Sequence, residues 1–147
     1  MEYVTKLFGK IDVDDSKVIT FPEGLLGFPD MKRFALIFDS DNSDAKGLNF
    51  LASLDEPAFV MPVVPAVAVK PDYSPQISAE VEKSIGELTE DNVLILVTMT
   101  IPSNITEMTV NLNAPIIINA DTGKAAQSVV ENEGYDIKYP IYDALKN

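Results

Sequence analysis

The chain has 147 residues, of which 46% are hydrophobic and 23% charged, the balance of a soluble globular fold with a sizeable core. It contains no cysteine, histidine or tryptophan, which excludes disulfides and thiol chemistry and removes the commonest nucleophile–base pairs and zinc ligand sets. The formal net charge of −12 repels phosphate backbones and attracts basic proteins, although it also serves solubility alone, so we expect no direct nucleic-acid binding.

Neither a membrane span nor a signal peptide is indicated. The longest apolar candidate, Phe59–Val69, is shorter than the roughly 18 residues that a span needs, and it contains prolines. The N-terminal stretch MEYVTKLFGK has a glutamate at position 2 and lacks the apolar segment of a signal peptide. We therefore expect a cytoplasmic protein with no membrane partner.

The first half of the chain is predicted to form short strands, because its apolar residues are mainly β-branched or aromatic and lie between turn residues. A turn at 14–16 and a polar surface loop at 39–47 interrupt them, and a hairpin is expected around Asp55-Glu56-Pro57. The apolar runs are Val4, Leu7–Val13, Val18–Phe21, Phe34–Phe38, Asn49–Leu54 and Ala58–Val64.

The stretch FPEGLLGF, residues 21–28, combines a proline and two glycines with four large apolar side chains. Glycine and proline mark a turn, but a solvent-facing turn has no need of two phenylalanines and two leucines. We expect a compact connection with Leu25 and Phe28 turned inward to plug one end of the fold. The alternative is a surface that contacts a partner through Leu26 and Glu23.

A single helix is predicted over about residues 77–86. Ile77, Val81 and Ile85 recur at four-residue spacing on one face, and Gly86 is placed as a C-terminal stop. Before this helix, four prolines between positions 62 and 75 weaken any strand ladder, because proline has no N–H to donate.

Strands are expected again after the helix. Val93–Val97 is continuously apolar, so burial on both faces is predicted, and Ile116–Ile118 is a second buried run. Thr106–Leu112 and Ala125–Val130 are weaker strand candidates. Several short strands at roughly even spacing, with one helix, indicate a mainly β fold, a small barrel or sandwich that forms a single domain over 1–147.

Asp121-Thr122-Gly123 is the one motif that suggests catalysis. A triplet of this kind after an apolar strand presents the carboxylate of an aspartic protease, and a dimer would share one proton between two copies. The same residues also make an ordinary hairpin turn, since aspartate can accept a bond from its own backbone and glycine adopts positive φ. A lysine at position 124, directly after the glycine, does not suit a site in which two carboxylates share a proton. This favours the turn. We expect no catalytic residue, no metal and no cofactor.

Several segments, in order, resemble the flagellar assembly factor FliW family. The most specific are Gly-Leu-x-Gly-Phe at 24–28 and Asn-Leu-x-Ala-Pro-Ile at 111–116, and the resemblance spans nearly the whole chain. Leu26 departs from it, because the family commonly has proline there. The supporting segments are 51–59, 71–73, 93–100, 116–119, 125–127 and 139–141.

The resemblance implies a non-enzymatic, barrel-like protein that switches partners. Members of the family bind and antagonise the RNA-binding translational repressor CsrA, and they also bind flagellin. Flagellin that accumulates in the cell would occupy the factor and free the repressor to silence flagellin translation. Two alternatives stay open: an acidic β-barrel adaptor with another partner, and a dimeric aspartyl hydrolase. If the chain is a member of this family, we expect a monomer when unbound, with partner contacts at Glu23, Leu26, Phe28, Asp55 and Glu56.

Overall fold

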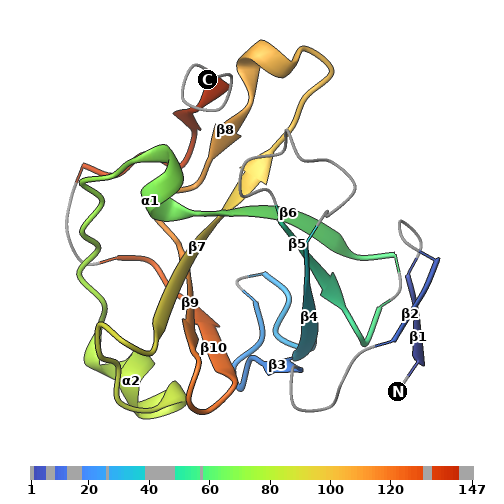
Figure 1. The fold of residues 1–147 in the computed structure, drawn as a ribbon. Coiled ribbons are helices and arrows are strands. Elements are labelled where there is room, and N and C mark those ends of the chain that lie inside the picture. The colour runs from blue at the N-terminus through green and yellow to red at the C-terminus, as the bar shows by residue number, and fades with distance from the viewer. Residues whose placement is uncertain are drawn as a thin grey trace.

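Seven strands close into a β-barrel in the computed structural model, which describes residues 2–5, 9–12, 18–25, 27–38, 49–56, 58–130 and 134–142. Around the ring the strand order is β7-β6-β5-β4-β3-β10-β9 and back to β7 (Figure 1). All neighbours are antiparallel except β3 and β10. The predicted mainly β, barrel-like fold is therefore confirmed. The strands are β3 (Ile19–Thr20), β4 (Arg33–Phe38), β5 (Asn49–Ser53), β6 (Val60–Pro65), β7 (Val93–Thr100), β9 (Ile116–Asn119) and β10 (Lys124–Gln127).

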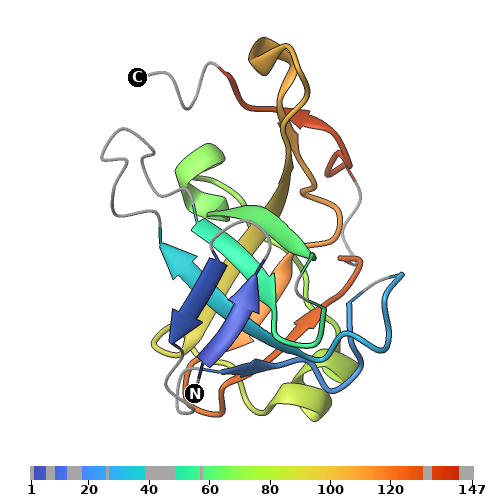
Figure 2. The same cartoon turned by 90° about the vertical axis from the view of Figure 1, so that its right-hand side faces the viewer.

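The remaining strands lie outside this ring. β1 (Glu2–Thr5) and β2 (Gly9–Asp12) form a separate antiparallel hairpin, which lies on the side of the barrel that faces the viewer in Figure 2. β8 (Thr109–Val110) pairs with the far half of β7, and β11 (Tyr139–Pro140) pairs with β8. These two strands extend the sheet beyond one end of the barrel.

Two α-helices are present in the described part of the chain, where a single helix was predicted. α2 (Ala79–Ile85) is the predicted one, and it ends at Gly86 as expected. α1 (Ala66–Val69) is a four-residue turn of helix that follows Pro65 directly. Four residues are too few to show helical periodicity, and their valines favour a strand, which is why sequence patterns miss it. α2 lies at the opposite end of the barrel from β8 and β11 in both views (Figure 1 and Figure 2).

The strand expected over Thr106–Leu112 is mostly wrong. Residues Ile105–Glu107 form a 3-10 turn, because the Asn104 carboxamide accepts hydrogen bonds from the backbone and hydroxyl of Thr106. Only Thr109–Val110 pair as a strand. The chain then turns at Asn111, whose side-chain oxygen accepts the N–H groups of Asn113 and Ala114.

The continuous apolar runs reflect coverage of both faces of the sheet. On β9, Ile116 and Ile118 pack in the barrel interior, whereas Ile117 packs outward under α2 with Val81 and Ile85. Successive strand residues point to opposite faces, so both faces must be apolar where a helix covers the outside. The burial predicted for Ile116–Ile118 is confirmed.

On β7 the prediction of burial on both faces holds only in part. Leu96 is buried in the barrel and Val97 outside it, but Leu94 is 38% exposed. Leu94 alternates onto the same face as Leu96 and lies near the start of the strand, beside the turn that follows α2. Solvent therefore reaches the barrel end that Leu94 occupies.

The FPEGLLGF stretch forms a tight reversal at the barrel end. Leu25 and Phe28 exchange backbone hydrogen bonds of 3.1 and 2.8 Å. Gly24 has φ +71°, and a Cβ there would lie 2.4 Å from the carbonyl oxygen of Pro29, so only glycine fits. Leu25 is buried as predicted, but Phe28 is 47% exposed, which corrects its predicted inward orientation.

Candidate functional site

Phe28 is the exposed end of a row of phenylalanines that runs out from the barrel core. Phe21 and Phe34 are fully buried and meet edge to face at 5.1 Å between ring centroids. Phe34 meets Phe59 at 6.3 Å, and Phe59 meets Phe28 at 5.1 Å, both edge to face. Such pairs orient one another beyond simple burial. Packing against the core through Phe34 thus fixes an aromatic surface at this place. We call Phe28 and Phe59 the aromatic rim.

The aromatic rim adjoins the turn of the β5–β6 hairpin, which carries Asp55 and Glu56. The N–H of Phe59 donates to the Glu56 carbonyl at 3.0 Å, and the Ser53 hydroxyl accepts the N–H groups of Asp55 and Glu56 at 3.1 and 2.9 Å. The predicted hairpin is therefore confirmed. Two of the predicted contact positions thus lie on the turn that Phe59 adjoins, and Phe59 is in contact with the exposed Phe28 ring.

Asp55 is already hydrogen-bonded within the fold. Its Oδ2 accepts the N–H groups of Lys32 and Arg33 at 3.2 and 3.0 Å, and its Oδ1 accepts the Arg33 guanidinium at 3.1 and 3.0 Å. Burial by itself would raise the pKa of Asp55, but the hydrogen bonds from Arg33 and Lys32 outweigh it and lower the pKa below the ordinary value. Asp55 joins the start of β4 to the β5–β6 turn.

The other two predicted contact residues do not lie in this arrangement. Leu26 falls outside the described residues. Glu23 is exposed and lines a separate shallow hollow of about 160 Å³, with residues of α2 and of β10 on its other walls. The structure thus brings Phe28, Asp55 and Glu56 into one neighbourhood and places Glu23 beside α2.

Acidic side chains gather around α2 and the two turns next to it. The amide of Asn92 donates to the Glu87 carbonyl at 2.9 Å and to the Asp121 carboxylate at 3.0 Å, so the α2–β7 turn and the β9–β10 turn adjoin. The only lysines on these segments are Lys83 and Lys124. We call this surface the acidic end, and its exposed carboxylates are Glu80, Glu82, Glu87, Glu90, Asp91 and Asp121.

Asp121 lies in a hairpin turn, as the preferred reading of Asp121-Thr122-Gly123 predicted. Its N–H donates to the side-chain oxygen of Asn119 at 2.9 Å, and the N–H of Gly123 donates to the Asn119 carbonyl at 2.9 Å. The carboxylate is exposed and accepts the Asn92 amide. These contacts are those of a turn between β9 and β10, which sets the place of Asp121 at the acidic end.

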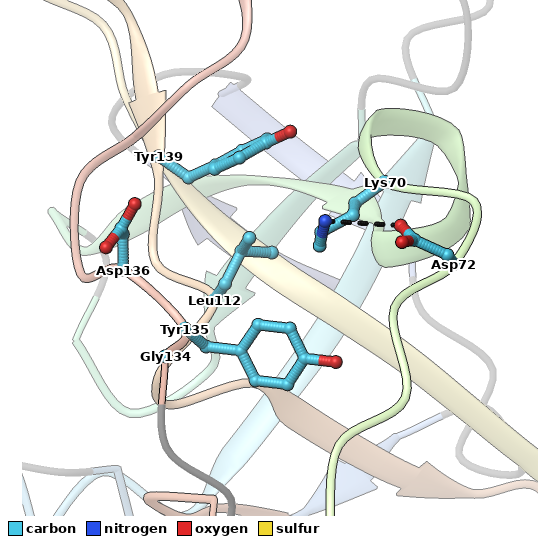
Figure 3. A pocket seen from close by; sticks show the side chains of 7 residues that line it. All are labelled: Lys70, Asp72, Leu112, Gly134, Tyr135, Asp136 and Tyr139. Carbon is cyan, nitrogen blue, oxygen red and sulfur yellow. Dashed lines mark ion pairs between the residues drawn. The ribbon is translucent and has the colours of Figure 1, made fainter.

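The described residues also line a half-enclosed cavity of about 320 Å³ between the segment after α1 and the β8–β11 extension. We call it the tyrosine pocket. Figure 3 shows the Tyr139 ring above Leu112 and the Tyr135 ring below it, with Asp136 on one side and the Lys70–Asp72 ion pair on the other. Its lining residues are Lys70, Asp72, Leu112, Gly134, Tyr135, Asp136 and Tyr139.

The walls of the tyrosine pocket are held by side chains from distant parts of the chain. The hydroxyl of buried Tyr73 donates to the Leu112 carbonyl, and its ring meets that of Tyr135 at 4.6 Å between centroids. The Tyr135 hydroxyl accepts the N–H of Ser74 at 2.9 Å. Burial, and to a smaller extent Tyr135, raises the pKa of Tyr73 far above its ordinary value, so its hydroxyl remains a donor.

Sequence reasoning did not single out this pocket. Lys70 and Tyr139 lie far apart in the chain, and no motif links them. The only signal was the presence of Pro71-Asp72-Tyr73 and Tyr139-Pro140-Ile141 among the segments that carry the family resemblance.

The described residues hold no group of three acid, histidine or cysteine side chains placed to bind a metal ion. The polar surface loop predicted at 39–47, with its aspartates, falls outside the described residues.

Neither α1, α2 nor any other helix in the described ranges has the length and apolar character needed to cross a bilayer.

Comparison with known proteins points to one family. The family model described as FliW protein matches residues 2–141. Proteins named flagellar assembly factor FliW are similar over nearly all of both chains. The one from Lachnospira eligens is 39% identical, over 99% of this chain and 97% of the relative. The one from Caldanaerobacter subterraneus is 38% identical, over 100% and 97%. The one from Thermotoga neapolitana is 36% identical, over 99% and 96%.

The fold has a counterpart among solved structures. A crystal structure of the flagellar assembly factor FliW superposes with a TM-score of 0.88, covering 97% of each chain at 23% sequence identity. The likeness at that identity concerns the fold, and it agrees with the closed barrel described above.

Proposed function

This chain belongs to the FliW family, and on that premise we propose that it is a flagellar assembly factor that works by exchanging two protein partners. One partner is a CsrA-type translational repressor, which the factor binds and antagonises. The other is flagellin, which occupies the factor when it accumulates and so frees the repressor to silence flagellin translation. The observation that carries the proposal is the full-length match to flagellar assembly factors.

Charge supports the repressor as one partner. A repressor that binds RNA must present a basic surface, and a chain with net charge −12 attracts such a surface over several ångströms. The acidic end is the surface best suited to this attraction, since six exposed carboxylates gather there against two lysines. We assign the first, steering contact with the repressor to the acidic end.

The same charge accounts for antagonism without direct competition for the RNA site. Carboxylates held beside the basic surface of the repressor repel RNA phosphates, and an exposed charge acts over about 8–10 Å at physiological salt. The factor would therefore weaken RNA binding from a neighbouring position. It would itself have no affinity for RNA, and in the unbound state it would be a monomer.

The aromatic rim offers the apolar part of a protein contact. Phe28 is about half exposed yet held in place by its edge-to-face contact with Phe59. Aromatic side chains that are ordered before binding lose little entropy on association and are common anchors in protein interfaces. Glu56, exposed on the adjoining turn, would add a negative charge at the edge of this contact.

Isothermal titration calorimetry with both partners from the same organism tests the proposal. The factor is titrated with the repressor, and flagellin is then added to the complex. Binding of the repressor followed by its displacement by flagellin is the expected result. Binding to neither, with both partners shown to be folded by circular dichroism, would contradict the partner exchange and favour an adaptor with another partner.

A further inference from the structure

The tyrosine pocket has one carboxylate in excess of its cation. Lys70 Nζ lies 3.2 Å from Asp72 Oδ1, so these two charges compensate each other. Asp136 lines the opposite side of the cavity and has no ion-pair partner among the described residues (Figure 3). The space between the two tyrosine rings is therefore bordered by an uncompensated negative charge.

Lys70 is a cation that already contacts both a carboxylate and a tyrosine ring of this pocket. Its ammonium group lies 5.6 Å from the centroid of the Tyr139 ring, within the range of a cation–π contact. Hydrogen bonding to Asp72 raises the pKa of Lys70 further above its ordinary value, so the group stays charged. One cation of the chain itself is thus already held by a carboxylate and a tyrosine face.

We propose that the tyrosine pocket receives the guanidinium group of an arginine side chain from a basic protein partner. The guanidinium would pair with the Asp136 carboxylate and lie against the tyrosine rings over Leu112. Only the identity of the partner, a CsrA-type repressor, rests on the function proposed above. The chemistry of the pocket does not depend on it.

The dimensions and walls of the pocket favour arginine over other side chains. A guanidinium is planar, stacks on aromatic faces and is more weakly hydrated than an ammonium, so it loses less on entering a half-enclosed site. The lining provides two phenol rings and a single aliphatic floor at Leu112. A cavity of about 320 Å³ is at the lower end of small-ligand sites, which suits one side chain better than a larger molecule.

An anionic ligand is the main competitor, because Lys70 is present. Its ammonium group is engaged by Asp72, and an anion would have to enter past Asp72 and Asp136 in a chain of net charge −12. Like-charge approach of this kind is unfavourable. The pocket therefore discriminates for a cation even though it contains one.

Proton–nitrogen NMR titrations of the full chain with small probes test the proposal without any partner protein. The probes are the N-acetyl 1-amides of L-arginine, L-lysine and L-aspartate, which keep their charged side chains and are called argininamide, lysinamide and aspartamide below. The argininamide is expected to shift the amide signals of Leu112, Gly134 and Tyr139 saturably. The lysinamide should bind more weakly and the aspartamide should leave these signals unchanged.

Two variants and a matched control complete the test. Asp136→Asn keeps the shape of the exposed side chain and should weaken argininamide binding about threefold to fivefold, the effect of losing a partly exposed charge pair. Tyr139→Leu should weaken it to a similar extent through loss of the ring face. Glu107→Gln removes an exposed carboxylate elsewhere and should have no effect.

The outcomes separate this proposal from the function proposed above. Shifts with the aspartamide in place of the argininamide, or argininamide binding that Asp136→Asn leaves unchanged, would overturn the arginine site. Calorimetry of Asp136→Asn with the repressor then tests the partner. Suppose that argininamide occupies the pocket and that the wild-type protein binds the repressor. Equally tight binding of the repressor by Asp136→Asn would then overturn the repressor as the source of the arginine and leave another basic protein as the partner of the pocket. Failure of wild type to bind the repressor would count against the partner exchange alone.

Discussion

The side-chain amide of Asn119, at the end of β9, donates to the carbonyl of Ile85, the last residue of α2, at 3.0 Å. Asn119 is 1% exposed, and its Nδ2 also donates to Glu87 O at 3.2 Å. Its Oδ1 accepts the N–H groups of Asp121 and Thr122. One buried carboxamide thus joins the helix end to both turns that carry the acidic end.

Replacing Asn119 by alanine should therefore destabilise the protein strongly. Loss of this carboxamide removes the acceptor of the Asp121 and Thr122 N–H groups and one of the two donors to each of the Ile85 and Glu87 carbonyls, which keep Thr122 Oγ1 and Asn92 Nδ2. The four lost hydrogen bonds together should cost about 2–3 kcal/mol in the free energy of unfolding. Urea denaturation followed by circular dichroism measures it. Asn104→Ala is the control for losing an asparagine outside this network: it removes only the exposed hydrogen bonds to Thr106 and should cost about 1 kcal/mol or less. Equal effects would show that the network does not hold the helix.

Gly24→Ala should be far more damaging than Gly27→Ala. Both residues have positive φ, and that conformation alone costs alanine about 1 kcal/mol. A Cβ at Gly24 also meets the Pro29 backbone at 2.4 Å, whereas one at Gly27 meets nothing within 4 Å. We expect a loss of at least about 3 kcal/mol for the first variant. Thermal unfolding of the two variants side by side decides whether the close approach of Pro29 is as tight as described.

Asp55→Asn should lower stability at neutral pH, and the difference should vanish in acid. The folded-state pKa of Asp55 is lowered, so its contribution is present above the ordinary value of 3.8 and is lost as the pH falls through the folded-state pKa. Charge-assisted hydrogen bonds at a partly exposed site suggest about 1–2 kcal/mol. Denaturation of both proteins from pH 7 down to pH 3 tests it. A gap that stays constant over this range would rule out the ionised carboxylate as its source.

Charge reversal at the acidic end should slow association with the repressor. Glu87→Lys and Glu90→Lys each reduce the attraction for a basic partner, so the association rate constant should fall and its dependence on salt should become weaker. Stopped-flow binding at several ionic strengths measures both. Glu107→Lys changes the net charge equally at a site near β8 and is the control. If all three variants behave alike, the net charge of the chain matters and the acidic end does not.

Phe28→Ala should weaken partner binding with little effect on folding. The ring is 47% exposed, so its removal loses only part of the usual packing energy, and we expect a cost of about 1 kcal/mol in stability. Affinity for the repressor or for flagellin should fall about tenfold or more if the aromatic rim is an anchor. Ile101→Ala, with a side chain 46% exposed, is a matched control. Unchanged affinity for both partners would remove Phe28 from the contact surface.

Most of the strands and α2 could be predicted because the sequence patterns that mark them are local. Short β-branched runs between turn residues identified most of the strands, and the spacing of Val81 and Ile85 identified α2. Closure of the ring was not predictable, since it depends on the first ring strand, β3, pairing with the last, β10, where Lys124 lies opposite Thr20 from the far end of the chain. The reading of 1–147 as a single domain stays a prediction.

The orientation of Phe28 illustrates why the site was harder to predict. Hydrophobicity favours an inward ring, but the tight reversal that Gly24 makes possible directs this residue to the surface while Leu25 is buried. The tyrosine pocket was harder still, because its walls come from the segment after α1, the segment after β8, and β11 with the residues before it. Assignment of partner contacts to Glu23, Leu26, Phe28, Asp55 and Glu56 stays a prediction.

The far edge of the extended sheet has a consequence for self-association. A ring of strands has no free edge, so the described sheet ends at β11, a strand of only two residues. The second of them is Pro140, which has no N–H with which to template an incoming strand. Growth of the sheet from one copy into the next is therefore blocked at this edge. The protein can therefore stay concentrated without polymerising through this edge of the sheet.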